Sequence, residues 1–274
     1  MPEEAPRYAL GHSDRELNRL TIQARLIEPI TRRFMVEAGI ASGMRVLEIG
    51  SGVGDVAFLV AGLVGEAGEV VGTDRSEAAL AVARRRADER SLGNVTFHQG
   101  DPSQLAFEES FDAVVGRYVL MFQPDPAAML RGVASHVRGG GIVVFHEPYR
   151  DTIRSYPPVP AYDRGCELVT EAVHRLGGDP LLGLKLHATF LAAGLPAPVL
   201  RLEAVIAGGG TSSSQVHFEL DLVETLLSDM ERMGLVAPGE IDPETIADIA
   251  IEEATVNESV IIGRGEVGAW AHKP

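Results

Sequence analysis

The chain has 274 residues, of which 45% are apolar, and a formal net charge of -15. This length accommodates one large α/β domain, or one domain with a sizeable insertion. The acidic charge argues against a surface that follows a nucleic-acid backbone, and no apolar run reaches the roughly 18 residues of a membrane span. The acidic N-terminus lacks the apolar stretch of a signal peptide. We therefore expect a cytoplasmic protein that binds neither nucleic acid nor membrane.

Short apolar stretches alternate with longer helical patterns from about residue 43 onward. The stretches lie at residues 45–49, 69–73, 95–98, 111–116 and 141–146, with helical patterns at 53–64, 76–91 and 125–137. This alternation predicts a parallel sheet with helices on both faces. Two later stretches, 198–207 and 259–271, extend the prediction to a seven-stranded, mostly parallel, doubly wound α/β sheet.

Two helical additions flank this pattern. Residues 1–42 form a predicted N-terminal cover, with a helical pattern over 13–38. A run rich in glycine and serine begins a second addition, the insertion 208–257, which contains two helical patterns. Because α/β enzymes build substrate sites at the carboxyl end of the sheet, we expect this insertion to cover a substrate. Residues 43–274 are predicted to form one domain that carries the insertion.

The first predicted strand leads through a glycine-rich turn directly into a helix. The turn is Glu48-Ile49-Gly50-Ser51-Gly52-Val53-Gly54, followed by Asp55. Its glycines let the backbone approach a nucleotide-like ligand closely. The dinucleotide fingerprint requires glycine or alanine where Asp55 stands, and an acid there opposes a pyrophosphate. A ligand with an ammonium group and no phosphate fits this charge pattern, and S-adenosylmethionine is such a ligand.

Two further acids follow the next two predicted strands. Asp74 ends the second strand, where a carboxylate can accept both ribose hydroxyl protons. Asp101 follows the third strand, in a position to meet an adenine amino group. A single loop aspartate is commonly only solvated or capping, but an acid after each of three successive strands predicts a cofactor site.

Residues 44–148 resemble the class I, Rossmann-like S-adenosylmethionine-dependent methyltransferases. The resemblance rests on the segments 46–54, 71–74, 100–101, 111–115 and 139–145. It implies S-adenosylmethionine as cofactor, S-adenosylhomocysteine as product, and an antiparallel last strand supplied by 259–271. The opening residues, including Tyr8 and Gln23, are similar to small-molecule methyltransferases of bacterial secondary metabolism and of the quinone-methylating type. In those proteins the leading helix closes over the cofactor.

Carried over residue by residue, the resemblance implies a set of cofactor-binding residues. The first glycines contact the methionine part, the acid after strand two holds the ribose, and the acid after strand three meets adenine. Two residues that end the fourth strand lie beside the expected methyl group. The set is Tyr8, Gln23, Glu48, Gly50, Ser51, Gly52, Asp74, Arg75, Gly100, Asp101, Pro102, Arg117 and Tyr118.

Three residues are candidates for catalysis. Methyl transfer from a sulfonium is an in-line displacement that needs a general base only where the acceptor keeps its proton. His146 and Glu147 follow the fifth strand, where the imidazole can abstract a proton and the carboxylate can orient it or bind an amine. Alternatively, His146 is hydrogen-bonded in the core and Glu147 caps a turn. His217, in the insertion, is a second candidate base.

These patterns predict a methyltransferase that acts on a small organic acceptor, with O-methylation of a natural product ahead of N- or C-methylation. A binding module, or an enzyme of other chemistry such as a cyclase on the same scaffold, remains open. Asp55 argues against a nicotinamide-dependent oxidoreductase. No metal is predicted, because no His, Asp or Glu pair has ligand spacing. Cys166 is expected as a small core residue, and both a monomer and a homodimer remain open.

Overall fold

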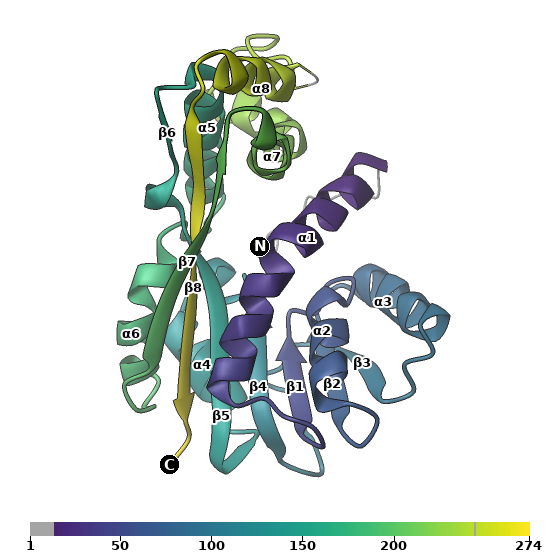
Figure 1. The fold of residues 1–274 in the computed structure, drawn as a ribbon. Helices are drawn as coiled ribbons and strands as arrows, with labels where there is room; N and C mark the ends of the chain where they lie inside the picture. Colours follow the sequence, from purple (N-terminus) through teal and green to yellow (C-terminus); the bar gives the residue numbers. More distant parts are fainter. Residues whose placement is uncertain (1–13, 244) are drawn as a thin grey trace. The chain divides into compact units, whose positions relative to one another are not determined.

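The computed structural model describes residues 14–243 and 245–274 (Figure 1). Its strands are β1 Arg45–Ile49, β2 Glu69–Asp74, β3 Val95–Gln99, β4 Phe111–Arg117, β5 Val137–Tyr149, β6 Arg154–Tyr156, β7 Val199–Gly208 and β8 Val260–His272. Its helices are α1 Asp14–Ala38, α2 Asp55–Val64, α3 Glu77–Glu89, α4 Pro126–Ala134, α5 Pro160–Arg175, α6 Leu182–Ala192, α7 Ser213–Arg232 and α8 Ile246–Val256. Short 3-10 turns cover Leu120–Phe122, Arg150–Thr152 and Gly209–Thr211.

The strands join in one sheet with the order β3-β2-β1-β4-β5-β8-β6, and β7 also pairs with β8. Strands β1 to β5 pair in parallel, whereas β6 and β8 pair antiparallel. The prediction of a mostly parallel, doubly wound α/β sheet is therefore confirmed. The sheet has eight strands rather than the predicted seven. The additional strand, β6, has three residues, too few for an alternating pattern to be recognised.

The chain forms two compact units. One unit holds residues 28–148, 181–203 and 266–274, and the other holds residues 149–180 and 204–265 together with the described residues before 28. The second unit therefore includes 149–180 as well as all described residues of the predicted insertion. The predicted domain division stays a prediction.

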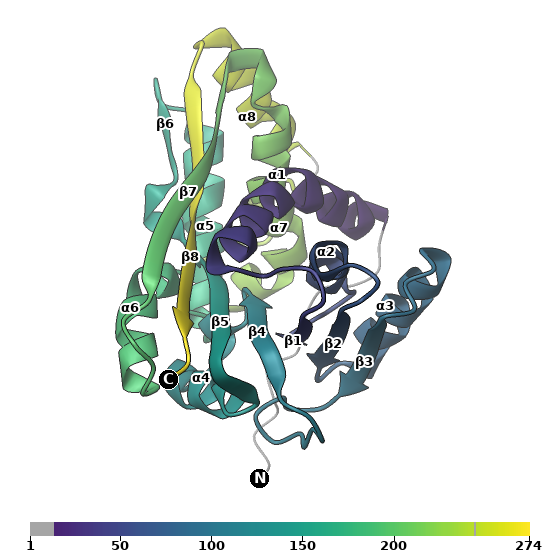
Figure 2. The same cartoon turned by 60° about the horizontal axis from the view of Figure 1, so that its bottom comes forward.

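In the first unit, β1 lies at the centre of the parallel sheet. Val46, Leu47 and Ile49 are fully buried, because helices cover both faces of the strand. Helices α2 and α3 pack on β1, β2 and β3, while α4 packs against α6 (Figure 2). The chain proceeds outward from β1 to β3 and then returns to β4 on the other side. This reversal at β1 and β4 is the switch point where open α/β sheets bind ligands, at the carboxyl ends of the strands.

In the second unit, α5, α7 and α8 pack around a shared apolar core. Tyr162, Cys166 and Val169 place α5 in this core, at the spacing of one helix face. Neither α5 nor α6 was predicted, although this stripe was a usable signal for α5. Cys166 is 2% exposed, which confirms it as a core residue, and burial raises the pKa of its thiol well above the usual value.

Candidate functional site

The glycine-rich turn after β1 adopts a backbone that favours glycine. Gly50, Gly52 and Gly54 have φ angles of 67°, 52° and 92°, in the left-handed region that side chains rarely adopt. A Cβ on Gly50 would overlap the side chain of Val119, which follows β4. A Cβ on Gly52 would meet no described atom within 4 Å. The turn thus packs tightly on one side and presents bare backbone to open space on the other.

Glu48, the second-last residue of β1, is a buried carboxylate behind this turn. Its exposed fraction is 1%, and Oε2 has no hydrogen-bond partner among the residues that the structure describes. Burial raises the pKa of Glu48 to about 8, while the Ser51 hydroxyl and the Arg117 charge act in the opposite direction. A buried carboxylate oxygen without a partner is costly. A cationic group bound beside the turn would satisfy it, so this site fits the ammonium group of S-adenosylmethionine.

Asp74 joins the end of β2 to the glycine turn. Its Oδ2 accepts a hydrogen bond from the backbone N–H of Gly52 at 2.9 Å, and its Oδ1 accepts one from Ser76 N at 2.8 Å. A carboxylate has about four acceptor positions, so these two bonds leave capacity for ribose hydroxyls. Asp74 therefore positions the turn in addition to its expected contact with a ligand.

Asp101 lies two residues beyond the end of β3, and it also bonds to its neighbours. Arg75 Nη2 donates to its Oδ2 at 2.8 Å, and Ser103 donates to Oδ1 through both its amide and its hydroxyl. Burial works to raise the pKa of Asp101, but the bonds from Ser103 and Arg75 outweigh burial and lower it. Of its neighbours, Gly100 has a φ of 149°, and the Pro102 carbonyl bonds to His136 Nε2 at 2.9 Å.

Asp55, the first residue of α2, forms an ion pair with Arg86 of α3. The two atoms, Oδ1 and Nη2, lie 2.6 Å apart, and Arg86 also donates to the Val53 carbonyl. The negative charge that the sequence places at the start of this helix is therefore partly offset. The charge of Asp55 is therefore a weaker argument against a pyrophosphate in the structure than in the sequence. A binding measurement with S-adenosylmethionine and with NAD distinguishes the two cofactors.

Glu147, on β5, is fully buried and holds the segment that follows β4. Its Oε1 accepts the backbone N–H groups of Val119 and Leu120 at 3.0 and 2.8 Å, and its Oε2 accepts that of Met121 at 3.3 Å. Burial raises the pKa of Glu147 to about 8, and these donors oppose the shift. Through Val119, which packs on Gly50, Glu147 shapes the glycine turn. Its geometry fits a positioning role.

His146, also on β5, takes part in a buried polar network. Its Nδ1 lies 3.1 Å from Thr31 Oγ1, and its Nε2 lies 2.7 Å from Glu266 Oε2. The same Glu266 oxygen accepts the Tyr118 hydroxyl at 2.7 Å, and Arg117 Nη1 donates to Thr31 Oγ1 at 3.2 Å. Thr31 and Glu266 are fully buried. Three predicted residues, Arg117, Tyr118 and His146, are thus brought together by two that the sequence analysis missed. For Glu266, an acid within the apolar stretch 259–271 was a usable signal.

The comparison with known proteins decides the family. Residues 40–174 match a family model described as a methyltransferase domain. This part of the chain is therefore similar to methyltransferase domains. The demethylmenaquinone methyltransferase of Lactococcus lactis is 34% identical over 135 residues, which cover 49% of this chain and 51% of that protein. The aklanonic acid methyltransferase DauC of a Streptomyces is 33% identical over 141 residues, or 51% of this chain and 63% of that protein.

The chain thus spans 51% and 63% of the length of these two relatives. The crystal structure of the cyclase SpnF covers 90% of this chain and 81% of its own chain, with a TM-score of 0.53 and 21% identity. At this identity the likeness concerns the fold alone. The predicted resemblance to class I methyltransferases is confirmed.

Three predicted residues belong to the second unit or have side chains outside the described residues. His217 lies on α7 in the second unit, where its Nδ1 is 3.2 Å from Asp221 Oδ1. Tyr8 lies outside the described residues. Gln23 lies in α1, and its side chain is likewise outside the description. The roles of these three residues stay predictions.

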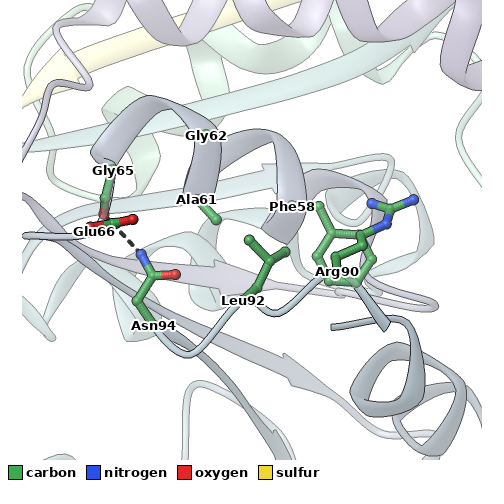
Figure 3. Close-up of a pocket in the computed structure, with 8 residues that line it drawn as sticks. All are labelled: Phe58, Ala61, Gly62, Gly65, Glu66, Arg90, Leu92 and Asn94. Carbon is green, nitrogen blue, oxygen red and sulfur yellow. Dashed lines mark hydrogen bonds between the residues drawn. The ribbon is translucent and has the colours of Figure 1, made fainter. Parts of the chain in front are cut away.

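A surface hollow on the methyltransferase domain lies between α2 and the segment after α3. Figure 3 shows it lined by Phe58, Arg90, Leu92 and Asn94, with Asn94 bonded to the Gly65 carbonyl at 2.9 Å. It contains none of the predicted site residues. Within 14–243 and 245–274, no cluster of three potential metal ligands occurs, and no helix is both long and apolar enough to span a membrane.

Proposed function

We propose that this protein transfers a methyl group from S-adenosylmethionine to a small organic acceptor, first of all a hydroxyl group of a natural product. The observation that carries the proposal is the convergence of the glycine turn, Asp74 and Asp101 at the carboxyl ends of β1, β2 and β3 in a methyltransferase domain. We expect the reaction to take place in a bacterial cytoplasm as part of secondary metabolism.

Each part of the cofactor has residues suited to it. The bare backbone at Gly50, Ser51 and Gly52 suits the methionine part, and the unpaired oxygen of Glu48 suits its ammonium group. Asp74, with Arg75 beside it, suits the ribose, and the turn formed by Gly100, Asp101 and Pro102 suits adenine. Arg117 and Tyr118 suit the wall beside the methyl group. Tyr8 and Gln23 complete the proposed set as a cover.

When bound, the cofactor would supply a methyl group on a sulfonium, whose carbon–sulfur bond would break as the acceptor bonds to the methyl carbon from the opposite side. The protein's own residues have to align the acceptor and exclude water, which supplies much of the acceleration. Glu147 supports this by fixing the backbone of Val119, Leu120 and Met121 next to the glycine turn. A rigid turn holds the cofactor in one position relative to the acceptor.

The names of the relatives favour a small acceptor. One relative is named for demethylmenaquinone and the other for aklanonic acid, both small organic molecules. The net charge of -15 also opposes a polyanionic macromolecule as substrate. N- and C-methylation are the next candidates after O-methylation. A non-methylating enzyme is the second candidate function, because the cyclase SpnF shares this fold.

The test is an acceptor screen with mass-spectrometric detection of both products. The purified protein is incubated with S-adenosylmethionine and a panel of phenols, quinols, amines and carbon acids. We expect S-adenosylhomocysteine and a methylated product in equal amounts, and we expect both to fall together in the Asp74→Ala variant when the cofactor is not saturating. Conversion of an acceptor with unchanged methyl count would favour the cyclase alternative. Cofactor binding without any conversion would favour a binding module.

A further inference from the structure

Tyr118 has an unusual backbone conformation at the edge of the proposed site. It is the first residue beyond β4, and its φ of 57° lies in the left-handed region. A bulky residue adopts this region only where its surroundings hold it there, and such residues cluster at functional sites. The backbone N–H of Tyr118 donates to the His146 carbonyl at 2.9 Å, which fixes the residue to β5.

Two buried carboxylates hold Tyr118 in place, one through the backbone that follows it and one through its hydroxyl. Glu147 fixes the backbone of the next three residues, of which Val119 packs on Gly50 of the glycine turn. Glu266, on β8, accepts the phenol hydroxyl itself at 2.7 Å. The hydrogen bond from its hydroxyl therefore fixes the Tyr118 ring. The next residue, Val119, contacts the glycine turn of the proposed cofactor site.

Glu266 has the geometry of a proton acceptor. A single oxygen, Oε2, lies 2.7 Å from both Tyr118 Oη and His146 Nε2. These two hydrogen bonds favour the charged form of the carboxylate, while its complete burial opposes it. We assign a proton to His146 Nε2 on this basis, because the carboxylate is the strongest acceptor next to the ring.

We propose that Tyr118 and Glu266 form a proton relay that deprotonates a hydroxyl acceptor, an inference that rests on the proposed methyl transfer. The acceptor oxygen forms a bond to the methyl carbon as the carbon–sulfur bond breaks. The acceptor's proton passes to Tyr118 Oη, and the proton of Tyr118 passes to Glu266 Oε2. The negative charge of Glu266 is neutralised as the positive charge on sulfur is lost, so total charge is conserved.

His146 is a positioning residue in this relay. Both of its ring nitrogens face polar atoms, Thr31 Oγ1 and Glu266 Oε2, so the imidazole acts on the acceptor only through the carboxylate. Phe34 packs against the ring edge-on, with centroids 5.0 Å apart, and limits its rotation. Tyr118 is then the catalytic residue that touches the acceptor.

The relay predicts a specific dependence on the acceptor. With a hydroxyl that is protonated at the assay pH, Tyr118→Phe and Glu266→Gln should each lower kcat by about 100-fold, a larger effect than either has on cofactor affinity. With an analogue that is already an oxyanion at that pH, the loss of kcat in both variants should be at least about tenfold smaller. Tyr156→Phe, which removes an exposed hydroxyl on β6, serves as the matched control. Equal losses with both acceptors would show a structural role and overturn the relay.

A second measurement tests the relay without turnover. Nitrogen-15 NMR of the cofactor-free protein distinguishes which ring nitrogen of His146 carries a proton, with His146→Gln used to assign its signals. We expect a proton on Nε2 in the wild-type protein. A neutral ring protonated on Nδ1 alone would require Glu266 to be protonated already, and it would overturn the relay even if methyl transfer is observed. If no acceptor is methylated, this result still decides whether Glu266 can accept a proton, separately from the proposed function.

Discussion

Replacing Glu48 by Gln tests whether cofactor binding ionises this buried carboxylate. The pKa of Glu48 is raised to about 8 by burial, so at pH 6.5 about 97% of it is protonated in the free protein. An ammonium group bound beside Oε2 favours the charged form and lowers this pKa. If binding lowers this pKa well below the assay pH, close to one proton is released for each ligand bound at pH 6.5.

The assay is calorimetric titration with S-adenosylhomocysteine at pH 6.5 in two buffers of different ionisation enthalpy. For the wild-type protein, the apparent binding enthalpy should differ between the buffers by close to the full difference in their ionisation enthalpies. Affinity should rise as the pH is raised from 6.5 towards 8. Glu48→Gln should bind more weakly and without proton release, whereas Asp74→Asn should keep the release. Equal enthalpies in both buffers for the wild-type protein would refute the contact between Glu48 and the ammonium group of the ligand.

Further substitutions have definite expected outcomes. Asp74→Ala should weaken cofactor binding by about 1–3 kcal/mol, the value of charge-assisted hydrogen bonds, and unchanged affinity by calorimetry would remove the ribose assignment. Gly52→Val should lower cofactor affinity at least about tenfold, because its side chain enters the open space beside the turn. Gly43→Val, with φ 83° and equally open surroundings before β1, should carry a similar backbone cost but leave affinity unchanged. Glu147→Gln should lower the free energy of unfolding in urea by about 1–3 kcal/mol, because an amide nitrogen replaces one of the two acceptor oxygens that face buried N–H groups. Since the folded pKa of Glu48 and Glu147 is about 8 rather than 4.5, their stabilising effect is present below about pH 4.5 and is lost as the pH rises towards 8. The unfolding free energy of Glu48→Gln should therefore fall less steeply over this range than that of the wild type.

The sheet and the glycine turn could be predicted because their signals are local. The alternation of apolar strands with helices, and the turn between β1 and α2, each occupy a short continuous segment whose chemistry specifies its conformation. The positions of Asp74 and Asp101 follow from the parallel sheet, since parallel strands bring their carboxyl ends to one edge. These features needed no knowledge of tertiary contacts.

The polar network could not be predicted, because its members come from distant parts of the chain. Glu266 meets His146 across 120 positions, and Thr31 meets the same ring across 115. Only the pairing of β8 beside β5 brings Glu266 to this edge. The hydrogen bonds from the residues after β4 to Glu147 depend likewise on the direction in which the Glu147 side chain leaves the sheet. The helix α5 is a different case, since its apolar stripe was visible in the sequence and was overlooked.

The central claim is that the glycine turn binds S-adenosylmethionine. Calorimetric titration of the purified protein, freed of co-purified ligand, with S-adenosylmethionine, S-adenosylhomocysteine and NAD tests it most directly. We expect micromolar binding of the first two and none of NAD. Tight binding of NAD with no binding of either sulfur compound would contradict the account, and the turn would then hold a dinucleotide.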